Sequence, residues 1–146
     1  MRADLGQLVK EASAILKSDA KGAVAKLESA YALACEAGVA SETASVAEEL
    51  SRGWARRKSA AKSLYYATKA TKLAPDSKSA WTTLAKTCEL VGVRTDAPTK
   101  RRRSQALFRG AASAFKRAAA LAKDPEDKRW LLELARDASR QAKPTG

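Results

Sequence analysis

The side chains that could carry out acid–base or nucleophilic chemistry are few and poorly spaced. Two carboxylate pairs occur, Glu48–Glu49 and Glu126–Asp127. Adjacent residues on a helix point about 100° apart, so neither pair can share one site as a catalytic dyad must. The sequence contains no histidine, so Ser–His and Cys–His nucleophile pairs cannot form. We therefore predict a protein that is not an enzyme, while a reaction built on Lys, Tyr or Asp alone stays open.

The composition also argues against a bound metal or cofactor. The two cysteines, Cys35 and Cys88, lie far apart in apolar helical patterns, and without histidine they cannot complete a usual zinc site. Neither a GxxxxGK[ST] nor a GxGxxG phosphate loop occurs. We expect both cysteines to be buried free thiols, with a disulfide as the alternative. Free thiols are typical of a reducing cytoplasmic location.

Lysine and arginine give the chain a net charge of +12 that is unevenly distributed. Residues 1–50 hold five basic and eight acidic residues, so the excess lies in residues 51–146. A helix over residues 59–74 would align its basic residues along one face, with a tyrosine in the middle of that face. A second basic stretch opens the next long helix, and several of its members recur every seven residues. These two stretches comprise Lys58, Lys62, Tyr65, Lys69 and Lys72, and Lys100, Arg101, Arg102, Arg103, Arg109, Lys116 and Lys123.

Every amphipathic helix has a solvated polar face, which by itself explains the spacing of these charges. It does not explain the single sign, because solubility alone usually mixes positive and negative residues. The asymmetry between the two parts of the chain instead indicates an acidic partner for the C-terminal part. The two stretches are therefore predicted to form a polyanion-binding basic patch.

Apolar residues recur at helical spacing almost throughout, and β-branched residues are sparse. We predict an all-α fold of about seven antiparallel helices in one domain at residues 1–142, followed by a disordered tail at 143–146. No apolar stretch is long enough to cross a bilayer, so no membrane segment is expected. Aspartates at positions 4, 19 and 124 are expected to cap helices, and Gly38–Val39 and Gly92–Val93 to end them.

Residues 67–86 and 115–136 resemble each other: each ends an alanine-rich helix, turns through proline and aspartate, and starts a helix with Trp followed by Leu and Ala. This helix–turn–helix repetition resembles the tetratricopeptide repeat (TPR) family. The residues that carry the resemblance are Trp81, Leu84, Ala85, Cys88 and Gly92, preceded by Ser63, Ala67 and Ala70, and by Leu50 and Trp54. It implies a superhelix of three stacked hairpins plus a C-terminal capping helix. A generic seven-helix bundle is the alternative.

The resemblance also implies a function, because proteins of this family bind extended peptides in a concave surface lined by the first helix of each hairpin. In that register Arg52, Arg56, Thr82 and Lys86 would face the groove, and their charge suits an acidic protein or peptide. The alternative is a nucleic-acid partner, RNA or DNA, whose backbone the basic patch would contact while Tyr65 stacks on a base. A membrane-surface helix is disfavoured, because the apolar face of residues 99–123 is mostly alanine and is needed for packing. The oligomeric state is left open.

Overall fold

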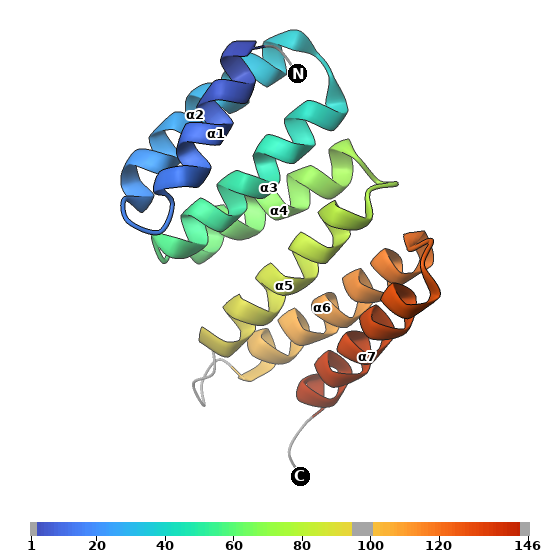
Figure 1. Cartoon of the computed structure of the whole chain (residues 1–146). Coiled ribbons are helices and arrows are strands. Elements are labelled where there is room, and N and C mark those ends of the chain that lie inside the picture. Colours follow the sequence, from blue (N-terminus) through green and yellow to red (C-terminus); the bar gives the residue numbers. More distant parts are fainter. Residues whose placement is uncertain (1–2, 95–100, 144–146) are drawn as a thin grey trace. The chain divides into compact units, whose positions relative to one another are not determined.

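The computed structural model describes residues 3–94 and 101–143, which contain seven α-helices and no β-strand (Figure 1). The predicted all-α fold class is therefore confirmed. None of the described helices is long and apolar enough to cross a membrane. The helices are α1 (Ala3–Ile15), α2 (Ala20–Ala37), α3 (Ala40–Arg56), α4 (Ala60–Leu73), α5 (Lys78–Arg94), α6 (Arg101–Leu121) and α7 (Pro125–Ala142).

The chain forms two compact units, Met1–Pro75 and Asp76–Gly146. In the first unit α1 packs on α2, α2 on α3 and α3 on α4, and in the second unit α5 packs on α6 and α6 on α7. Successive helices are thus neighbours in space, as expected for hairpins joined by short turns. The single domain over residues 1–142 stays a prediction. Of the predicted tail, Lys143 forms the C-cap of α7, and residues 144–146 lie outside the described residues.

Each unit has its own apolar core, built largely from small residues. Leu5, Leu27 and Leu50 are the largest fully buried side chains of the first core, and alanines of α2 fill the space between them. The second core surrounds Phe115, which is completely buried, and Leu131. Because alanine adds so little bulk, the helix axes can approach closely, and a few large side chains then fill each core.

The hairpins α3–α4 and α5–α6 each contain the same kind of hydrogen bond between their two helices. In the first hairpin the buried hydroxyl of Ser51 donates to the carbonyl of Ser63 at 2.9 Å, and the hydroxyl of Ser63 donates to the carbonyl of Ser51 at 2.8 Å. In the second hairpin the Ser104 hydroxyl donates to the carbonyl of Gly92 at 2.9 Å. Both pairs are twelve residues apart. In this contact Ser51 and Ser63 correspond to Gly92 and Ser104.

The predicted helix end at Gly92–Val93 was wrong. Gly92 is buried inside α5, which continues to Arg94. A Cβ atom on Gly92 would lie 3.1 Å from the ring of Phe108. The glycine therefore allows α6 to pack closely on α5 and does not end the helix.

Most other helix boundaries follow the local sequence. The Asp19 side chain accepts a hydrogen bond from the backbone N–H of Gly22 at 2.9 Å, and Asp124 caps α7 with Pro125 in its first turn. Gly38 ends α2 in the left-handed conformation, with φ 72°. These predictions are confirmed. Asp4, in contrast, lies inside the first turn of α1 and is not its N-cap.

Lys58 follows the end of α3 and has an unusual backbone conformation, with φ 61°. Among the non-glycine residues of 3–94 and 101–143, it alone has a positive φ. Its N–H donates to the Ala55 carbonyl at 3.0 Å, and the N–H of Ser59 donates to the Trp54 carbonyl at 2.9 Å. These two bonds form a Schellman motif, in which glycine usually occupies the position of Lys58. Lys58 therefore lies in the turn between α3 and α4, and its predicted place on the α4 face was wrong.

Candidate basic binding surfaces

The α4 surface carries the rest of the first predicted basic stretch. Lys62 and Lys72 are exposed, Lys69 is half-buried, and Tyr65 is 57% exposed. No ion pair neutralises these three lysines within residues 3–94 and 101–143. The Tyr65 ring packs edge-on against Tyr66, with 5.1 Å between ring centroids, so one edge of the tyrosine is supported and much of its surface faces solvent.

An aromatic cluster anchors this surface to the first core. The Trp54 indole N–H and the Tyr66 hydroxyl both donate to the carboxylate of Glu28, at 3.2 Å and 3.1 Å. The ammonium of Lys62 lies 4.0 Å from the centre of the Trp54 ring, and the guanidinium of Arg57 lies 5.1 Å from it. Cations attract the ring face at such distances. Lys62 is thus partly held by Trp54 and does not extend freely into solvent.

Burial and charge keep two phenols of this cluster protonated. Desolvation, followed by the charge of Glu28, raises the pKa of Tyr66 well above its ordinary value. Desolvation, followed by the neighbouring Cys35, raises the pKa of Tyr31 to about 12. A proton is held more tightly where the phenolate would be poorly solvated and close to negative charge. The cluster therefore packs α2, α3 and α4 together through neutral phenols and one carboxylate.

The second predicted basic stretch lies along α6. Arg101, Arg102 and Arg103 form its exposed first turn, and Arg109 and Lys116 are exposed further along. Lys100 lies outside the described residues. Lys123 lies beyond the end of α6 at Leu121, in the turn to α7, so its predicted place on the same helical face was wrong.

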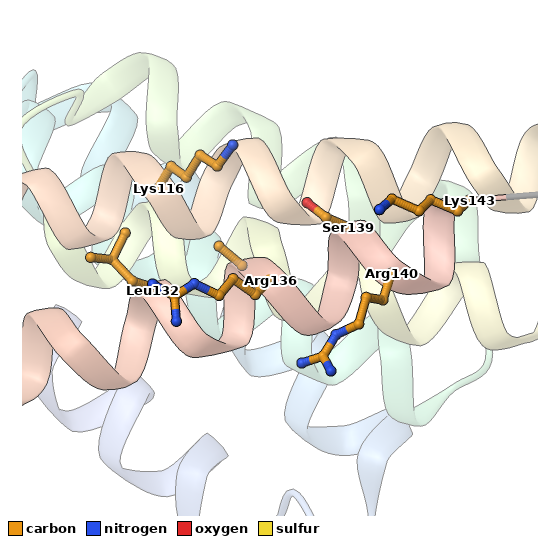
Figure 2. A pocket seen from close by; sticks show the side chains of 7 residues that line it. Lys116, Leu132, Arg136, Ser139, Arg140 and Lys143 are labelled. Carbon is orange, nitrogen blue, oxygen red and sulfur yellow. The ribbon is translucent and has the colours of Figure 1, made fainter.

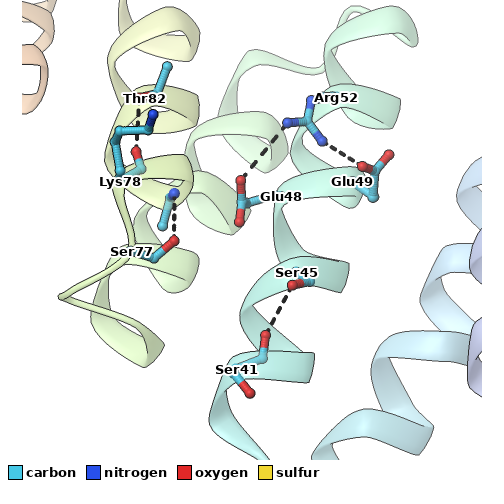
Figure 3. Close-up of polar contacts among 9 residues, drawn as sticks. Ser41, Ser45, Glu48, Glu49, Arg52, Ser77, Lys78 and Thr82 are labelled. Atoms are coloured by element: carbon cyan, nitrogen blue, oxygen red, sulfur yellow. Dashed lines mark hydrogen bonds and ion pairs between the residues drawn. The ribbon is translucent and has the colours of Figure 1, made fainter. Parts of the chain in front are cut away.

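The four residues expected to line a peptide groove differ in their surroundings. Arg52 is paired with Glu49 at 2.6 Å and with Glu48 at 3.9 Å, and the Thr82 hydroxyl donates to the Lys78 carbonyl at 2.8 Å (Figure 3). The charge of Arg52 is therefore partly neutralised, and the Thr82 proton is used within its own helix.

The other two expected groove residues are exposed. Arg56 lies in the last turn of α3, and the Lys86 ammonium lies 5.8 Å from the centre of the Trp130 ring. Arg52 and Arg56 belong to the first compact unit, and Thr82 and Lys86 to the second. Their common groove stays a prediction.

A basic groove that the sequence analysis did not predict runs between α6 and α7 in the second unit (Figure 2). It has a volume of about 510 Å³. Its apolar lining comes from Leu132 and Ala135, and its polar lining from cations and one hydroxyl. The lining residues are Lys116 from α6, then Leu132, Ala135, Arg136, Ser139 and Arg140 from α7, and Lys143 at its C-cap. We call this feature the α6–α7 groove.

The cations of the α6–α7 groove are largely unneutralised. Arg140 forms an ion pair with Asp137, one turn away on α7. Lys116, Arg136 and Lys143 have no ion pair within the part of the chain that the structure describes. Of the predicted basic patch, only Lys116 lines the groove. The other cations come from α7, whose polar residues recur at four- and three-residue steps, a spacing visible in the sequence.

A smaller cavity of about 280 Å³ lies in the same unit and shares Lys143 with the groove. Val93, Arg101 and Phe108 contribute to its lining. The Ser104 hydroxyl at this cavity already donates to the backbone of α5. The cavity therefore adds one further cation, Arg101, to the basic surface of the second unit.

Acidic side chains and the two cysteines are the candidate metal ligands in the described part of this histidine-free chain. Within residues 3–94 and 101–143, no three Asp, Glu or Cys side chains are close enough to hold a metal ion. Cys88 is buried as predicted, and burial raises the pKa of its thiol to about 11. Cys35 is exposed, so its predicted burial was wrong. Trp130 was also expected on the apolar side of its helix, but it is 49% exposed.

No model of a known protein family matches the sequence, and no curated protein matches it.

Proposed function

We propose that the chain is a cytoplasmic, non-enzymatic TPR-like scaffold that binds an acidic protein or peptide through its basic surface, with the α6–α7 groove as the main contact. The observation that carries this proposal is the combination of the half-buried aliphatic side chain of Leu132 with cations around it, three of which have no ion pair within the described residues. A cation without a partner next to an apolar surface favours a ligand that brings both carboxylates and apolar side chains.

The lining of the groove favours a protein over a nucleic acid. Bases bind single-strand surfaces mainly by stacking on aromatic rings, and no ring lines the α6–α7 groove. Leu132 instead offers hydrocarbon surface that matches apolar side chains. The guanidinium of Arg136 can bind a carboxylate or a phosphate through two parallel hydrogen bonds, so the preference for a protein rests on the aliphatic lining.

A nucleic-acid backbone is the second candidate, and the α4 surface supports it. Tyr65 is 57% exposed and lies one helical turn from both Lys62 and Lys69 on α4. A ring flanked by cations provides stacking together with phosphate contacts. The two candidates therefore use different surfaces, which makes them separable by mutation.

The test compares two fluorescent probes, polyglutamate and a single-stranded DNA oligonucleotide, by anisotropy. Lys116→Glu with Arg136→Glu changes the α6–α7 groove, and Lys62→Glu with Lys69→Glu changes α4 by the same charge. We expect polyglutamate to bind more tightly than DNA, and the groove variant to weaken it more than the α4 variant does. Tighter DNA binding lost in the α4 variant, or purification with nucleic acid that gives a high 260/280 nm absorbance ratio, would support the alternative and refute the proposal.

A further inference from the structure

The α7 lining of the α6–α7 groove has the length and spacing that suit contact with another helix. Its α7 lining residues Leu132, Arg136, Ser139 and Lys143 follow one another at steps of four, three and four. They therefore form one stripe along the helix. At about 1.5 Å per residue this stripe is roughly 16 Å long, close to three turns of a partner helix. Lys116 of α6 lines the other side of the groove (Figure 2).

The packing of the second unit leaves one side of α7 uncovered. Helix α6 packs against both α5 and α7, whereas the main packing of α7 within the described residues is against α6. Leu132, on the groove side of α7, remains half-buried. Trp130 and Leu134 lie on the opposite side of the helix, where Trp130 is close to Lys86 of α5. A helix bound in the groove would contact both α6 and α7 and would cover the exposed hydrocarbon of Leu132. Burying such surface is favourable by about 25 cal/mol per Å².

The charge of the lining determines which helix fits. None of the seven lining residues is acidic, and four of them are basic. Three of those cations, Lys116, Arg136 and Lys143, have no ion pair within the described residues. A basic or neutral helix would leave these charges facing it without partners. A helix with carboxylates on both flanks of a narrow apolar stripe would pair with them from both sides.

We propose that the α6–α7 groove binds an acidic amphipathic helix of a partner protein, which packs across α6 and α7 as an additional helix of the second unit. This proposal rests on the proposed function and specifies the partner: its apolar side chains at i, i+3/i+4 and i+7 face the groove and contact Leu132. Glutamates or aspartates beside them pair with Lys116, Arg136 and Lys143. Helix-in-groove recognition of this kind reads spacing as well as charge.

The experiment uses two capped peptides of identical composition, each about 16 residues of glutamate, alanine and leucine, which as a helix of about 24 Å spans the stripe and extends beyond it. In the first peptide the leucines share one helical face, and in the second they are scrambled around the helix. Affinity for the full-length protein is measured by fluorescence anisotropy, and peptide helicity by circular dichroism of the mixture. We expect the first peptide to bind on the order of tenfold more tightly and to gain helicity on binding.

The groove is tested with Lys116→Glu combined with Arg136→Glu. The matched control is Arg102→Glu with Arg103→Glu, which changes the charge equally on exposed residues that do not line the groove. We expect the groove variant to weaken the amphipathic peptide by roughly tenfold or more and the control to weaken it by much less. Sedimentation of the protein alone reports self-association, which the groove variant would abolish if a second copy were the occupant.

The outcomes separate this proposal from the one on which it rests. Equal binding of the two peptides, or equal loss in the groove and control variants, would show attraction by charge alone. That result would refute binding of an amphipathic helix but would remain consistent with the proposed binding of an acidic partner. Binding of single-stranded DNA with no binding of either peptide would overturn both proposals. Self-association through the groove would assign it to a second copy of this chain and overturn the partner helix.

Discussion

Glycine at position 58 should make the first unit more stable than alanine there, because the residue at this position, Lys58, occupies a backbone conformation that a Cβ atom disfavours. Its φ of 61° lies in the left-handed region. For a residue with a Cβ atom this conformation costs roughly 1–2 kcal/mol. Glycine avoids that cost but gains freedom in the unfolded chain, which offsets about 0.4–1 kcal/mol of the gain. The expected net stabilisation by glycine relative to alanine is therefore about 1 kcal/mol.

The reference for this comparison is Lys58→Ala rather than the lysine itself. A lysine near the C-terminus of α3 interacts favourably with the helix dipole, by about 0.3–1 kcal/mol. Both variants remove that charge, and both keep the backbone bonds that Lys58 and Ser59 make to Ala55 and Trp54. The difference between them therefore isolates the Cβ atom.

The assay is urea denaturation followed by far-ultraviolet circular dichroism, supported by melting temperatures. A difference of 1 kcal/mol corresponds to about 4–8 °C for a domain of 60–100 residues. Gly38→Ala provides the opposite case: φ is 72° there, and an added Cβ would meet no atom within 4 Å. We expect that variant to lose about 1 kcal/mol through the backbone alone. Equal urea midpoints for Lys58→Gly and Lys58→Ala would refute the reasoning.

Three further predictions follow from single contacts. Gly92→Val should destabilise the second unit by about 1–3 kcal/mol in urea denaturation, because its side chain overlaps the Phe108 ring; an unchanged midpoint would contradict the close packing of α5 and α6. In a thiol-reagent assay of the folded protein near pH 8, Cys35 should react quickly and the buried Cys88, with its raised thiol pKa, slowly; loss of the fast phase in Cys35→Ser checks the assignment. The raised pKa of Tyr31 means that its contribution to stability is complete below pH 10 and is lost as the pH rises toward 12. Unfolding free energies measured across this range should fall less steeply in Tyr31→Phe than in the parent protein, and equal slopes would contradict the prediction.

The predicted basic patch shows how far residue spacing alone can place side chains on one helical face. Steps of three, four and seven residues correctly place Lys62, Tyr65, Lys69 and Lys72 on one helix. They fail at Lys58 and Lys123, because each lies just beyond a helix end, where the backbone leaves the helical path. A helical period has meaning only inside the helix, and boundaries are its weakest part.

The repeat predicted from residues 67–86 and 115–136 rests on tryptophan, proline and aspartate near the turns, which mark where helices begin. The structure adds a contact between small residues in two hairpins, Ser51 with Ser63 and Gly92 with Ser104. Small residues at such a contact look unremarkable in an alanine-rich chain, so only the packing distinguishes them.

The local sequence by itself determined the all-α class and most helix ends. Capping by Asp19 and Asp124 and the left-handed turn at Gly38 depend on bonds between residues a few positions apart. Only the tertiary structure decided that Gly92 lies inside a helix, that Cys35 and Trp130 are exposed, and that α6 and α7 enclose a groove. Burial depends on which element covers a helical face. That covering element can come from another helix, as Lys116 of α6 and Arg136 of α7 show by lining one groove.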